Sequence, residues 1–422
     1  MGLTRRRFIQ GLSASAVLFG TMAGCSRSAG AARVVVIGGG FAGATAARYI
    51  RLWAPDIEVT LVEPNQQFVS CPLSNRVLAG TWQLSDVTMG YDALQEHGVR
   101  LLHRSAVDVD PENKRVTLDD GEVLEYDRLI VAPGIELDYD GIPAMRDPAT
   151  REVIPHAWKA GAQTALLRKQ LEDMEDGGVF AITVPRSPYR CPPGPYERAC
   201  QVAHYFRTHK PRSKVLVLDA NEDIVSKKGL FRKAWQERYA GIIEYHPNNA
   251  LVDVDVATRT AKLDFDDVKA DVLNVVPPQR AGRIAARTGL ITANDRWCEV
   301  DFLSYESLAV PNVHVLGDSI MAAPRMPKSG HMANQHGKVC AAAVIELLRG
   351  NQPDQSPLIT NTCYSFVSDK DVIHVASIHA YDAGQRTMVP IEGAGGLSEA
   401  ANEAEGVIAE SWGRNIWSDV LG

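Results

Sequence analysis

The feature that most constrains the fold is a glycine-rich turn near the N-terminus, between an apolar run and a helical pattern. Residues 33–37 are predicted to form a buried strand, and residues 44–50 a helix. The turn between them has the pattern G-x-G-x-x-G, with Gly38, Gly40 and Gly43. Such a turn lets backbone N–H groups approach a pyrophosphate at a helix N-terminus. The sequence therefore predicts a Rossmann-type nucleotide-binding domain.

A carboxylate and two later turns extend this motif. A second apolar run, residues 57–62, ends at Glu63, about 20 residues beyond the last glycine, where an acidic side chain binds the ribose of an adenine dinucleotide. Two later strands end in turns that contain Pro133, Gly134, Gly317 and Asp318. Alone, these are ordinary strand-end turns. With the glycine motif upstream the pattern favours FAD, and Asp318 is placed for its ribityl and pyrophosphate region.

The middle of the chain repeats the strand-helix-strand pattern without the glycine turn. Residues 179–184 and 214–219 are predicted to be strands, and residues 196–208 the helix between them. Residues 191–197, Cys-Pro-Pro-Gly-Pro-Tyr-Glu, stand where a second glycine motif would be. Three prolines and a cysteine do not suit a pyrophosphate, so the sequence predicts a second Rossmann-like domain with no NAD site.

These patterns predict an α/β protein with two Rossmann-like domains and a C-terminal α+β domain. The FAD-binding domain is expected to be discontinuous, because the second domain is inserted into it. The expected segments are an export signal at 1–31, the FAD-binding domain at 32–143 and 283–353, the second domain at 144–282 and the C-terminal domain at 354–422.

The first residues have the pattern of an export signal. Arg5, Arg6 and Arg7 precede a weakly apolar stretch at 11–23, which is shorter than the ~20 residues that a membrane-spanning helix needs. The pattern predicts a twin-arginine signal and a periplasmic protein, with Cys25 as a candidate for lipid attachment. No later run predicts a membrane span. A net charge of −7 argues against a nucleic-acid partner.

Six cysteines follow the signal, and they are widely spaced. They are Cys71, Cys191, Cys200, Cys298, Cys340 and Cys363. The sequence has no C-x-x-C pair, so no metal site and no covalent haem are expected in this chain. Cys200 and Cys340 are expected to be packing residues, and the sequence does not assign Cys298.

Three of these cysteines have positions that suit redox chemistry. Cys71 lies in the loop after the ribose strand, where its thiolate could tether the flavin 8-methyl carbon; a small buried hydrophobe is the alternative. Cys191 and Cys363 are expected at loop or strand starts, which suits a redox-active disulfide, or else a structural one. The sequence does not establish their pairing.

Several blocks of sequence carry a family resemblance across nearly the whole chain beyond the signal. They are residues 57–65, 71–75, 156–161, 168–174, 191–199, 277–282, 326–330 and 361–364. In these blocks the chain resembles the flavoprotein subunits of flavocytochrome c sulfide dehydrogenase. That family is related to the sulfide:quinone reductases among the glutathione-reductase-like flavoproteins.

The resemblance implies a cofactor, a catalytic pair and a partner. It implies FAD bound covalently through Cys71, a catalytic disulfide between Cys191 and Cys363, and a separate c-type cytochrome subunit that forms a heterodimer with this chain and accepts its electrons. Pro72 departs from the family pattern after the tethering cysteine, and residues 390–410 are shorter and more divergent. The C-terminal departure weakens any inference about contacts with a partner.

A mechanism follows as a hypothesis. Hydrosulfide, or a polysulfide, attacks the disulfide and the electrons pass to the flavin. Glu197 is the candidate general acid or base, although a carboxylate complementing the helix dipole is an equal alternative. Lys328, with Ser329 and Gly330, is assigned to flavin binding, where Lys328 would stabilise negative charge on the ring unless it is simply an exposed lysine.

Other functions and residues stay open. A sulfide:quinone reductase and an accessory flavoprotein of a thiosulfate-oxidising system are the alternative functions; the polar, acidic segment after Gly396 disfavours the first. Trp412 and Trp417 are candidates for the flavin ring, the docking face or the core. His331 and His336 are five residues apart, which does not place them on one helix face as metal ligands.

Overall fold

The computed structural model describes residues 30–422, and the first domain is built on a parallel sheet. The predicted export signal and Cys25 lie outside the described residues. The sheet has the order β21-β9-β1-β2-β5. Its strands are β1 (Arg33–Ile37), β2 (Glu58–Val62), β5 (Arg100–Leu102), β9 (Arg128–Val131) and β21 (Val313–Val315). Strand β21 therefore joins a sheet whose other strands precede residue 132.

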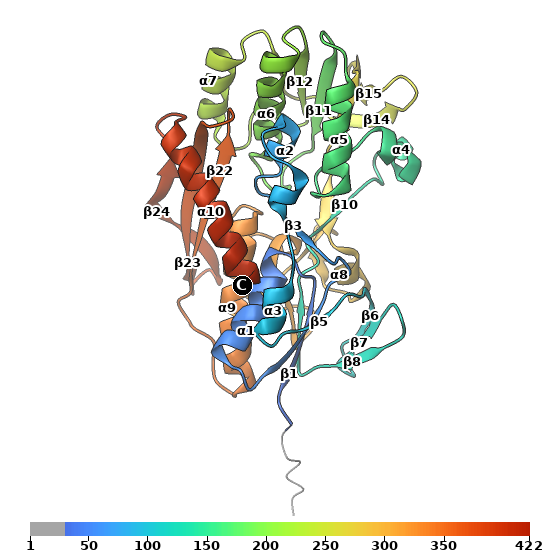
Figure 1. Ribbon diagram of the computed structural model, residues 1–422. Helices are drawn as coiled ribbons and strands as arrows, with labels where there is room; N and C mark the ends of the chain where they lie inside the picture. Colours follow the sequence, from blue (N-terminus) through green and yellow to red (C-terminus); the bar gives the residue numbers. More distant parts are fainter. Residues whose placement is uncertain (1–29) are drawn as a thin grey trace, which may run out of the picture.

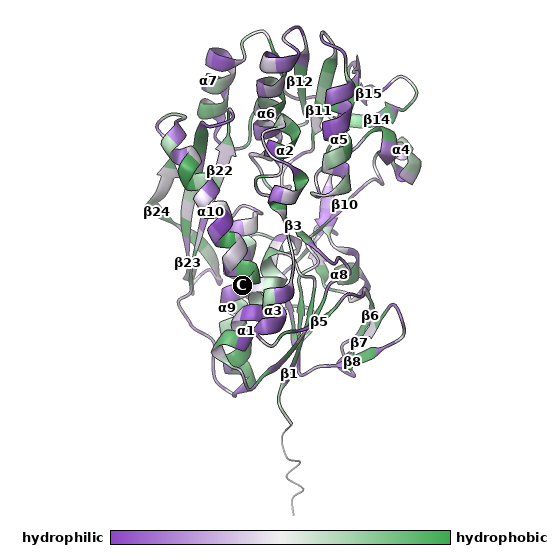
Figure 2. Ribbon diagram, in the orientation of Figure 1, coloured by the Kyte–Doolittle hydropathy of each residue, from purple (hydrophilic) through white to green (hydrophobic). Residues whose placement is uncertain are grey.

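The strands of this sheet are apolar runs because both of their faces are buried. Figure 2 shows the sheet interior as hydrophobic, and Val34, Val36 and Leu61 are fully buried. The helices α1 (Phe41–Trp53) and α9 (Gly330–Leu348) pack against each other beside the sheet. The first domain also contains a separate antiparallel sheet of three strands, β6 (Ala106–Asp110), β7 (Arg115–Leu118) and β8 (Val123–Glu125).

The second domain has its own parallel sheet, in the order β13-β12-β11-β17. Its strands are β11 (Val179–Val184), β12 (Lys214–Asp219), β13 (Ile243–His246) and β17 (Val272–Val275). Its helices are α5 (Ala162–Asp173), α6 (Gly194–His209) and α7 (Lys228–Arg238). An antiparallel sheet follows, with β14 (Leu251–Asp255), β15 (Thr260–Leu263) and β16 (Asp267–Lys269). Strands β10 (Ile135–Leu137) and β18 (Gln279–Ala281) pair where the two domains join.

Two predicted helices begin earlier than the sequence pattern indicates. Helix α6 begins at Gly194 rather than 196, because Pro195 is tolerated in the first turn, where a backbone N–H has no helical partner. Helix α9 begins at Gly330, although only its apolar second half, residues 339–348, was expected. Its start is fixed by Ser329, whose hydroxyl oxygen accepts a hydrogen bond from the Met332 N–H.

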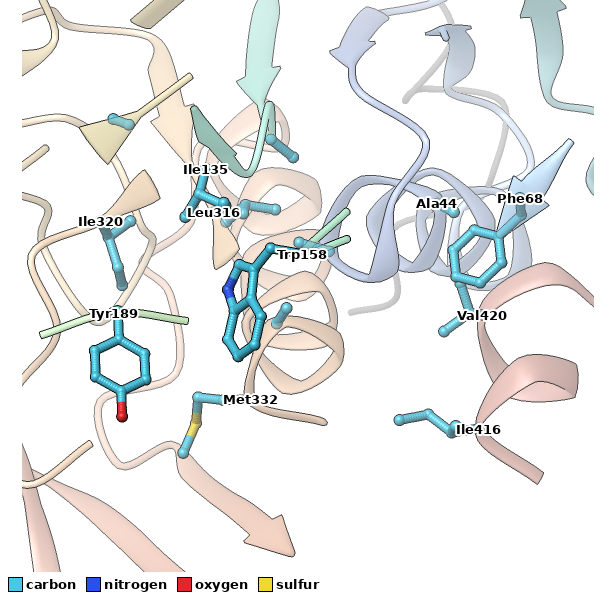
Figure 3. Close-up of a cluster of buried hydrophobic side chains, with 14 of the residues drawn as sticks. Ala44, Phe68, Ile135, Trp158, Tyr189, Leu316, Ile320, Met332, Ile416 and Val420 are labelled. Atoms are coloured by element: carbon cyan, nitrogen blue, oxygen red, sulfur yellow. The ribbon is translucent and has the colours of Figure 1, made fainter. Parts of the chain in front are cut away.

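The C-terminal domain is an antiparallel sheet and a helix, as predicted. It contains β22 (Leu358–Phe366), β23 (Val372–Asp382), β24 (Thr387–Leu397) and α10 (Glu403–Leu421). Helix α10 runs back to the first domain (Figure 1), and in Figure 3 its Ile416 and Val420 lie beside Phe68. The predicted α/β class with two Rossmann-like domains and a C-terminal α+β domain is confirmed.

Short elements complete the described chain. They are β3 (Phe68–Val69), α2 (Asn75–Ala79), β4 (Thr88–Met89), α3 (Asp92–Glu96), α4 (Pro148–Val153), α8 (Arg283–Arg287), β19 (Ile291–Ala293), β20 (Trp297–Cys298) and the 3-10 turns Leu84–Val87, Pro143–Arg146 and Gly317–Ser319. Within residues 30–422, no helix combines the length and the apolar character needed to cross a bilayer.

The close approach of α9 to α1 depends on Gly337, which gives a test of the packing. A Cβ at this position would lie 2.6 Å from the Ala42 carbonyl oxygen and 2.9 Å from the Thr45 Cβ. We therefore expect Gly337→Ala to lower the free energy of unfolding by about 1–3 kcal/mol through overpacking, measured by denaturant unfolding. The matched control is Gly229→Ala in α7, where a Cβ meets nothing within 4 Å. Equal stability of the two variants would contradict this packing.

Candidate functional site

A cavity of about 590 Å³ lies where the three domains meet. The first domain lines it with the glycine turn and Cys71, and the second domain with Cys191 and Glu197. The C-terminal domain contributes Cys363 and Trp412. The size suits a cofactor or a small molecule, and the cavity brings together residues that are far apart in the sequence.

The glycine turn forms one wall of the cavity, and its three glycines serve two purposes. A Cβ on Gly38 would lie 2.3 Å from the Ala132 carbonyl oxygen, and one on Gly43 would lie 1.9 Å from that of Gly38. These two glycines therefore allow helix and strands to pack closely. A Cβ on Gly40 would meet nothing within 4 Å. Gly40 is the N-cap residue of α1, and it has no side chain that could bind the N–H groups of the first turn. The first N–H groups of α1 are thus available to a pyrophosphate.

Glu63 also lines the cavity, and its carboxylate is held in place by the turn. One oxygen accepts a hydrogen bond from the Gly39 N–H at 2.7 Å, and the other from the Asn65 N–H at 2.8 Å. A carboxylate fixed beside a glycine turn suits the hydroxyls of a ribose. These features together fit the adenosine half of FAD.

The turns predicted to face the flavin half also reach the cavity. Its lining includes Pro133, Gly134, Gly317, Asp318, Ser329 and Gly330. Burial raises the pKa of Asp318, and the Arg190 guanidinium opposes that rise. Ser329 does more than line the cavity, because its hydroxyl donates to the Asn361 side-chain oxygen at 2.6 Å and so links α9 to β22.

Lys328 is buried, so the exposed-lysine alternative is wrong. Its ammonium donates hydrogen bonds to the carbonyls of Asp318 and Ile320 and lies 3.6 Å from the centre of the Trp297 ring. Burial lowers its pKa to about 8. Lys328 is not among the residues that line the cavity, and its own carbonyl accepts the Cys191 N–H at 2.8 Å.

The Cys71 thiol lies in the cavity, in the loop that follows β3. Its Sγ is 3.8 Å from the Trp158 carbonyl oxygen. The next residue, Pro72, packs against the start of α9, where a Cβ on Gly330 would lie 3.2 Å from its ring. The cysteine is partly exposed to the cavity rather than sealed in the core.

The proline-rich turn presents Cys191 to the cavity in an unusual backbone conformation. Cys191 has a positive φ of 57°, and its carbonyl accepts the Gly194 N–H at 2.8 Å. A Cβ on Gly194 would lie 3.0 Å from the Cys191 Sγ and 2.8 Å from the Trp158 ring. The glycine of this turn therefore makes room for a sulfur atom instead of a phosphate. A strained non-glycine residue of this kind is typical of a functional site.

Cys363 lies inside β22, not at a strand start as the sequence suggested. Its neighbours misled the prediction, since Asn361 and Thr362 favour turns but here belong to a strand paired with β23. Cys191 and Cys363 both line the cavity as free thiols. Burial raises the pKa of Cys191, and the nearby Cys363 thiol raises it further.

Glu197 is a buried carboxylate that contacts the other two domains. One oxygen accepts the Phe366 N–H of β22 at 3.0 Å, and the other accepts from the Asn75 amide at 3.3 Å. Burial raises its pKa. Although Glu197 stands in the first turn of α6, it faces the cavity rather than solvent, which favours a general acid or base over a surface charge on the helix dipole.

Two buried cations were missed by the sequence reading. Arg198 donates to the Asn75 and Asn274 side-chain oxygens and to the Ala157 carbonyl. Lys227, just before α7, donates to the Cys363 carbonyl at 2.8 Å. The sequence Ser-Lys-Lys-Gly around Lys227 is typical of an exposed loop, so nothing local marks this lysine as buried.

In the second Rossmann-like domain, the carboxylate that corresponds to Glu63 is bound by side chains of the same domain. Asp219 stands at the end of β12, much as Glu63 directly follows β2. Its carboxylate accepts hydrogen bonds from the hydroxyls of Tyr196 at 2.8 Å and Tyr245 at 3.0 Å. Tyr196 belongs to the helix that follows the proline-rich turn. The carboxylate at the position that binds a ribose in the first domain is thus already paired with two tyrosine hydroxyls.

The remaining candidates separate into cavity and core. Trp412 lines the cavity with Tyr364 and His331, at ring distances of 5.7 and 5.8 Å. Trp417 is buried and its indole N–H donates to the Ser70 hydroxyl. Fully buried positions are taken by Cys200, Cys298, Cys340 and His336. Among residues 30–422, no group of three or more His, Cys, Asp or Glu is arranged to hold a metal ion.

Family comparisons cover most of the chain in three parts. Residues 32–169 match the pyridine nucleotide-disulphide oxidoreductase family. Residues 164–277 match the central part of the sulfide dehydrogenase [flavocytochrome c] flavoprotein chain. Residues 355–421 match the flavin-binding part of flavocytochrome c sulphide dehydrogenase.

Individual relatives agree with these families. Over 48 residues the chain is 60% identical to the sulfide dehydrogenase [flavocytochrome c] flavoprotein chain of Chlorobaculum thiosulfatiphilum, covering 11% of this chain and 100% of that sequence. It is 24% identical to the mitochondrial sulfide:quinone oxidoreductase of Mus musculus, over 68% of this chain and 65% of the mouse protein. The structure of the sulfide:quinone oxidoreductase of Aquifex aeolicus has the same fold, with a TM-score of 0.76, 17% identity and coverage of 93% and 92%.

The buried Glu197 predicts a pH-dependent stability difference. Its pKa in the folded protein is raised above the ordinary 4.5, so the folded state binds this proton more tightly than the unfolded chain does. Wild type therefore loses stability from this group as the pH rises through the folded pKa, and Glu197→Gln does not. We expect the melting temperature of Glu197→Gln minus that of wild type to increase between pH 4.5 and 8, measured by calorimetry.

The control for this measurement is Glu237→Gln, which removes an exposed carboxylate from α7. A difference for Glu197→Gln that is flat with pH, or that falls as the pH rises, would show that the Glu197 proton is bound no more tightly in the folded state.

Proposed function

The chain belongs to the family of flavocytochrome c sulfide dehydrogenase flavoproteins, and on that premise we propose that it oxidises sulfide or polysulfide at Cys191 and Cys363 and passes the electrons to a c-type cytochrome partner. The observation that carries the proposal is the cavity, which holds the nucleotide turn, Cys71, both cysteines and Glu197. The proposal includes export to the periplasm by the N-terminal twin-arginine pattern.

FAD is the cofactor that these residues fit. The open N-terminus of α1 would hold the pyrophosphate, and Glu63 would hold the ribose. When bound, FAD supplies a two-electron acceptor beside the sulfur pair. In this proposal the Cys71 thiol is the atom that attaches the cofactor to the protein, since it lies in the same cavity and is partly exposed there.

The sulfur chemistry belongs to Cys191 and Cys363, which in the oxidised protein form a disulfide. Hydrosulfide attacks one sulfur atom, so that a new S–S bond forms and the S–S bond between the cysteines breaks. The other cysteine leaves with the electron pair as a thiolate. Glu197 accepts the proton of the attacking species, because burial has raised the pKa of its carboxyl and it faces the same cavity.

A quinone is the second candidate for the electron acceptor. The chain is similar to sulfide:quinone oxidoreductases, and its C-terminal domain exposes Leu397, Val407 and Ile408. The segment after Gly396 is thus less polar at its surface than its acidic composition indicated. The family comparison with the flavocytochrome c flavoprotein chain favours the cytochrome.

Covalent attachment of the flavin is tested by acid precipitation. We expect wild-type protein to carry its yellow colour into the pellet, and Cys71→Ser to release all flavin into the supernatant. Cys340→Ala is the matched control, because this cysteine is buried in α9 outside the cavity, and it should retain flavin in the pellet. Free flavin from wild-type protein would refute attachment through Cys71.

The role of the cysteine pair is tested by anaerobic titration with sulfide, followed through the flavin absorbance. Cys191→Ser and Cys363→Ser should each slow bleaching by about a hundredfold or more, because they remove a group that acts only in the reaction. Cys340→Ala should bleach at the wild-type rate. Equal rates in Cys191→Ser and wild type would show that sulfide reduces the flavin without the disulfide.

A further inference from the structure

We propose that Lys227 is a positioning residue for the sulfur pair: it fixes the strand that carries Cys363 and stabilises the negative charge that appears when the disulfide opens. This inference rests on the proposed function, and it concerns a residue of the second domain that reaches into the third.

The geometry places the Lys227 ammonium across two strands of the C-terminal sheet. The Nζ donates to the Cys363 carbonyl at 2.8 Å, to the Ser365 hydroxyl at 2.7 Å and to the Ile373 carbonyl at 3.3 Å. Ser365 on β22 pairs with Ile373 on β23, so the three acceptors form one compact group. All three protons of the ammonium have an acceptor, which fixes the side chain.

The backbone of Lys227 is also committed to this arrangement. The residue has a φ of 55° in the left-handed region, immediately before α7. Its carbonyl accepts the Phe231 N–H at 3.0 Å, and the residue is 6% exposed. Holding a non-glycine residue in this region costs free energy, as does burying an ammonium. A neutral hydrogen-bond donor could hold β22 without the free-energy cost of burying an ammonium.

The three acceptors of Lys227 are neutral, so none of them balances its positive charge. The charge therefore acts on titratable groups farther away. Burial lowers the pKa of Lys227 to about 8, and four groups oppose that fall: Cys363 on β22, Glu197 on α6, the Cys191 thiol and Glu405 on α10. Burial raises the pKa of Cys363, and the positive charge of Lys227 opposes that rise. An ammonium beside a sulfur pair favours the thiolate over the thiol.

This placement has a direct consequence for the reaction. When hydrosulfide attacks the disulfide, the sulfur atom that is not attacked leaves with the electron pair and carries a full negative charge. Lys227, which is itself buried, provides an opposite charge for it. The lysine touches the Cys363 carbonyl rather than the sulfur, so it acts by position and field and not by transferring a proton to substrate.

The test measures thiol ionisation rather than turnover. Folded holoprotein is reduced anaerobically with a phosphine and alkylated with iodoacetamide from pH 6 to 10, and the peptides that contain Cys191 and Cys363 are quantified by mass spectrometry. Lys227→Gln keeps a hydrogen-bond donor and removes the charge. We expect its Cys363 alkylation rate at pH 8 to fall by about tenfold, since a nearby opposite charge moves a pKa by about one unit or more.

Two further variants complete the design. Lys228→Gln removes the neighbouring exposed lysine, which pairs with Asp223, and should leave the curve at the wild-type position. Lys227→Arg keeps a charge that persists above pH 8. The midpoint pH of its Cys363 alkylation curve should therefore lie at or below that of wild type. If Lys227→Gln does not fold, judged by bound flavin, a Lys227→Arg midpoint above that of wild type overturns the proposal.

The outcome separates this inference from the proposed function. A Cys363 curve that is unchanged in Lys227→Gln refutes the role of Lys227 even if the protein oxidises sulfide. If the Cys363 alkylation curve shifts in Lys227→Gln but the wild-type protein fails to oxidise sulfide, the electrostatic role of Lys227 stands and the proposed function is refuted.

Discussion

The structure depends on the way buried charged groups of the second domain hold β22. Glu197 accepts the Phe366 N–H at one end of the strand, and Lys227 donates to the Cys363 carbonyl and the Ser365 hydroxyl. Both charged residues come from the second domain. Together with the bond from Ser329 to Asn361, these bonds hold Cys363 of the C-terminal domain at the cavity that the proline-rich turn of the second domain also lines.

Burying these charges has a cost that packing alone does not explain. Isolated charges are expensive in a protein interior unless they are hydrogen-bonded and paired. Here the carboxylate and the ammonium both bind β22, so the ammonium opposes the rise in the pKa of Glu197 that burial causes, and the carboxylate opposes the fall in the pKa of Lys227. Under the proposed function, the arrangement places a proton acceptor and a positive charge next to the strand that carries Cys363, where they would favour the opening of a disulfide.

The sequence predicted the parts of the site that are local and missed those that depend on the tertiary fold. The glycine turn, Glu63 and the strands β11 and β12 follow from short patterns of apolar residues and glycines. The position of Cys363 within β22 did not, because Asn361 and Thr362 favour turns until β23 pairs with them. Lys227 could not be found at all, since its burial depends on a strand 136 residues later in the chain.

The central claim is that Cys191 and Cys363 form the redox pair of the cavity. The most direct measurement is peptide mapping by mass spectrometry of the air-oxidised protein, digested without reductant after free thiols are blocked. The account predicts one cross-linked pair of peptides, joined through Cys191 and Cys363, which disappears after reduction with sulfide. Recovery of both residues as blocked free thiols, or of either one linked to another cysteine, would contradict it.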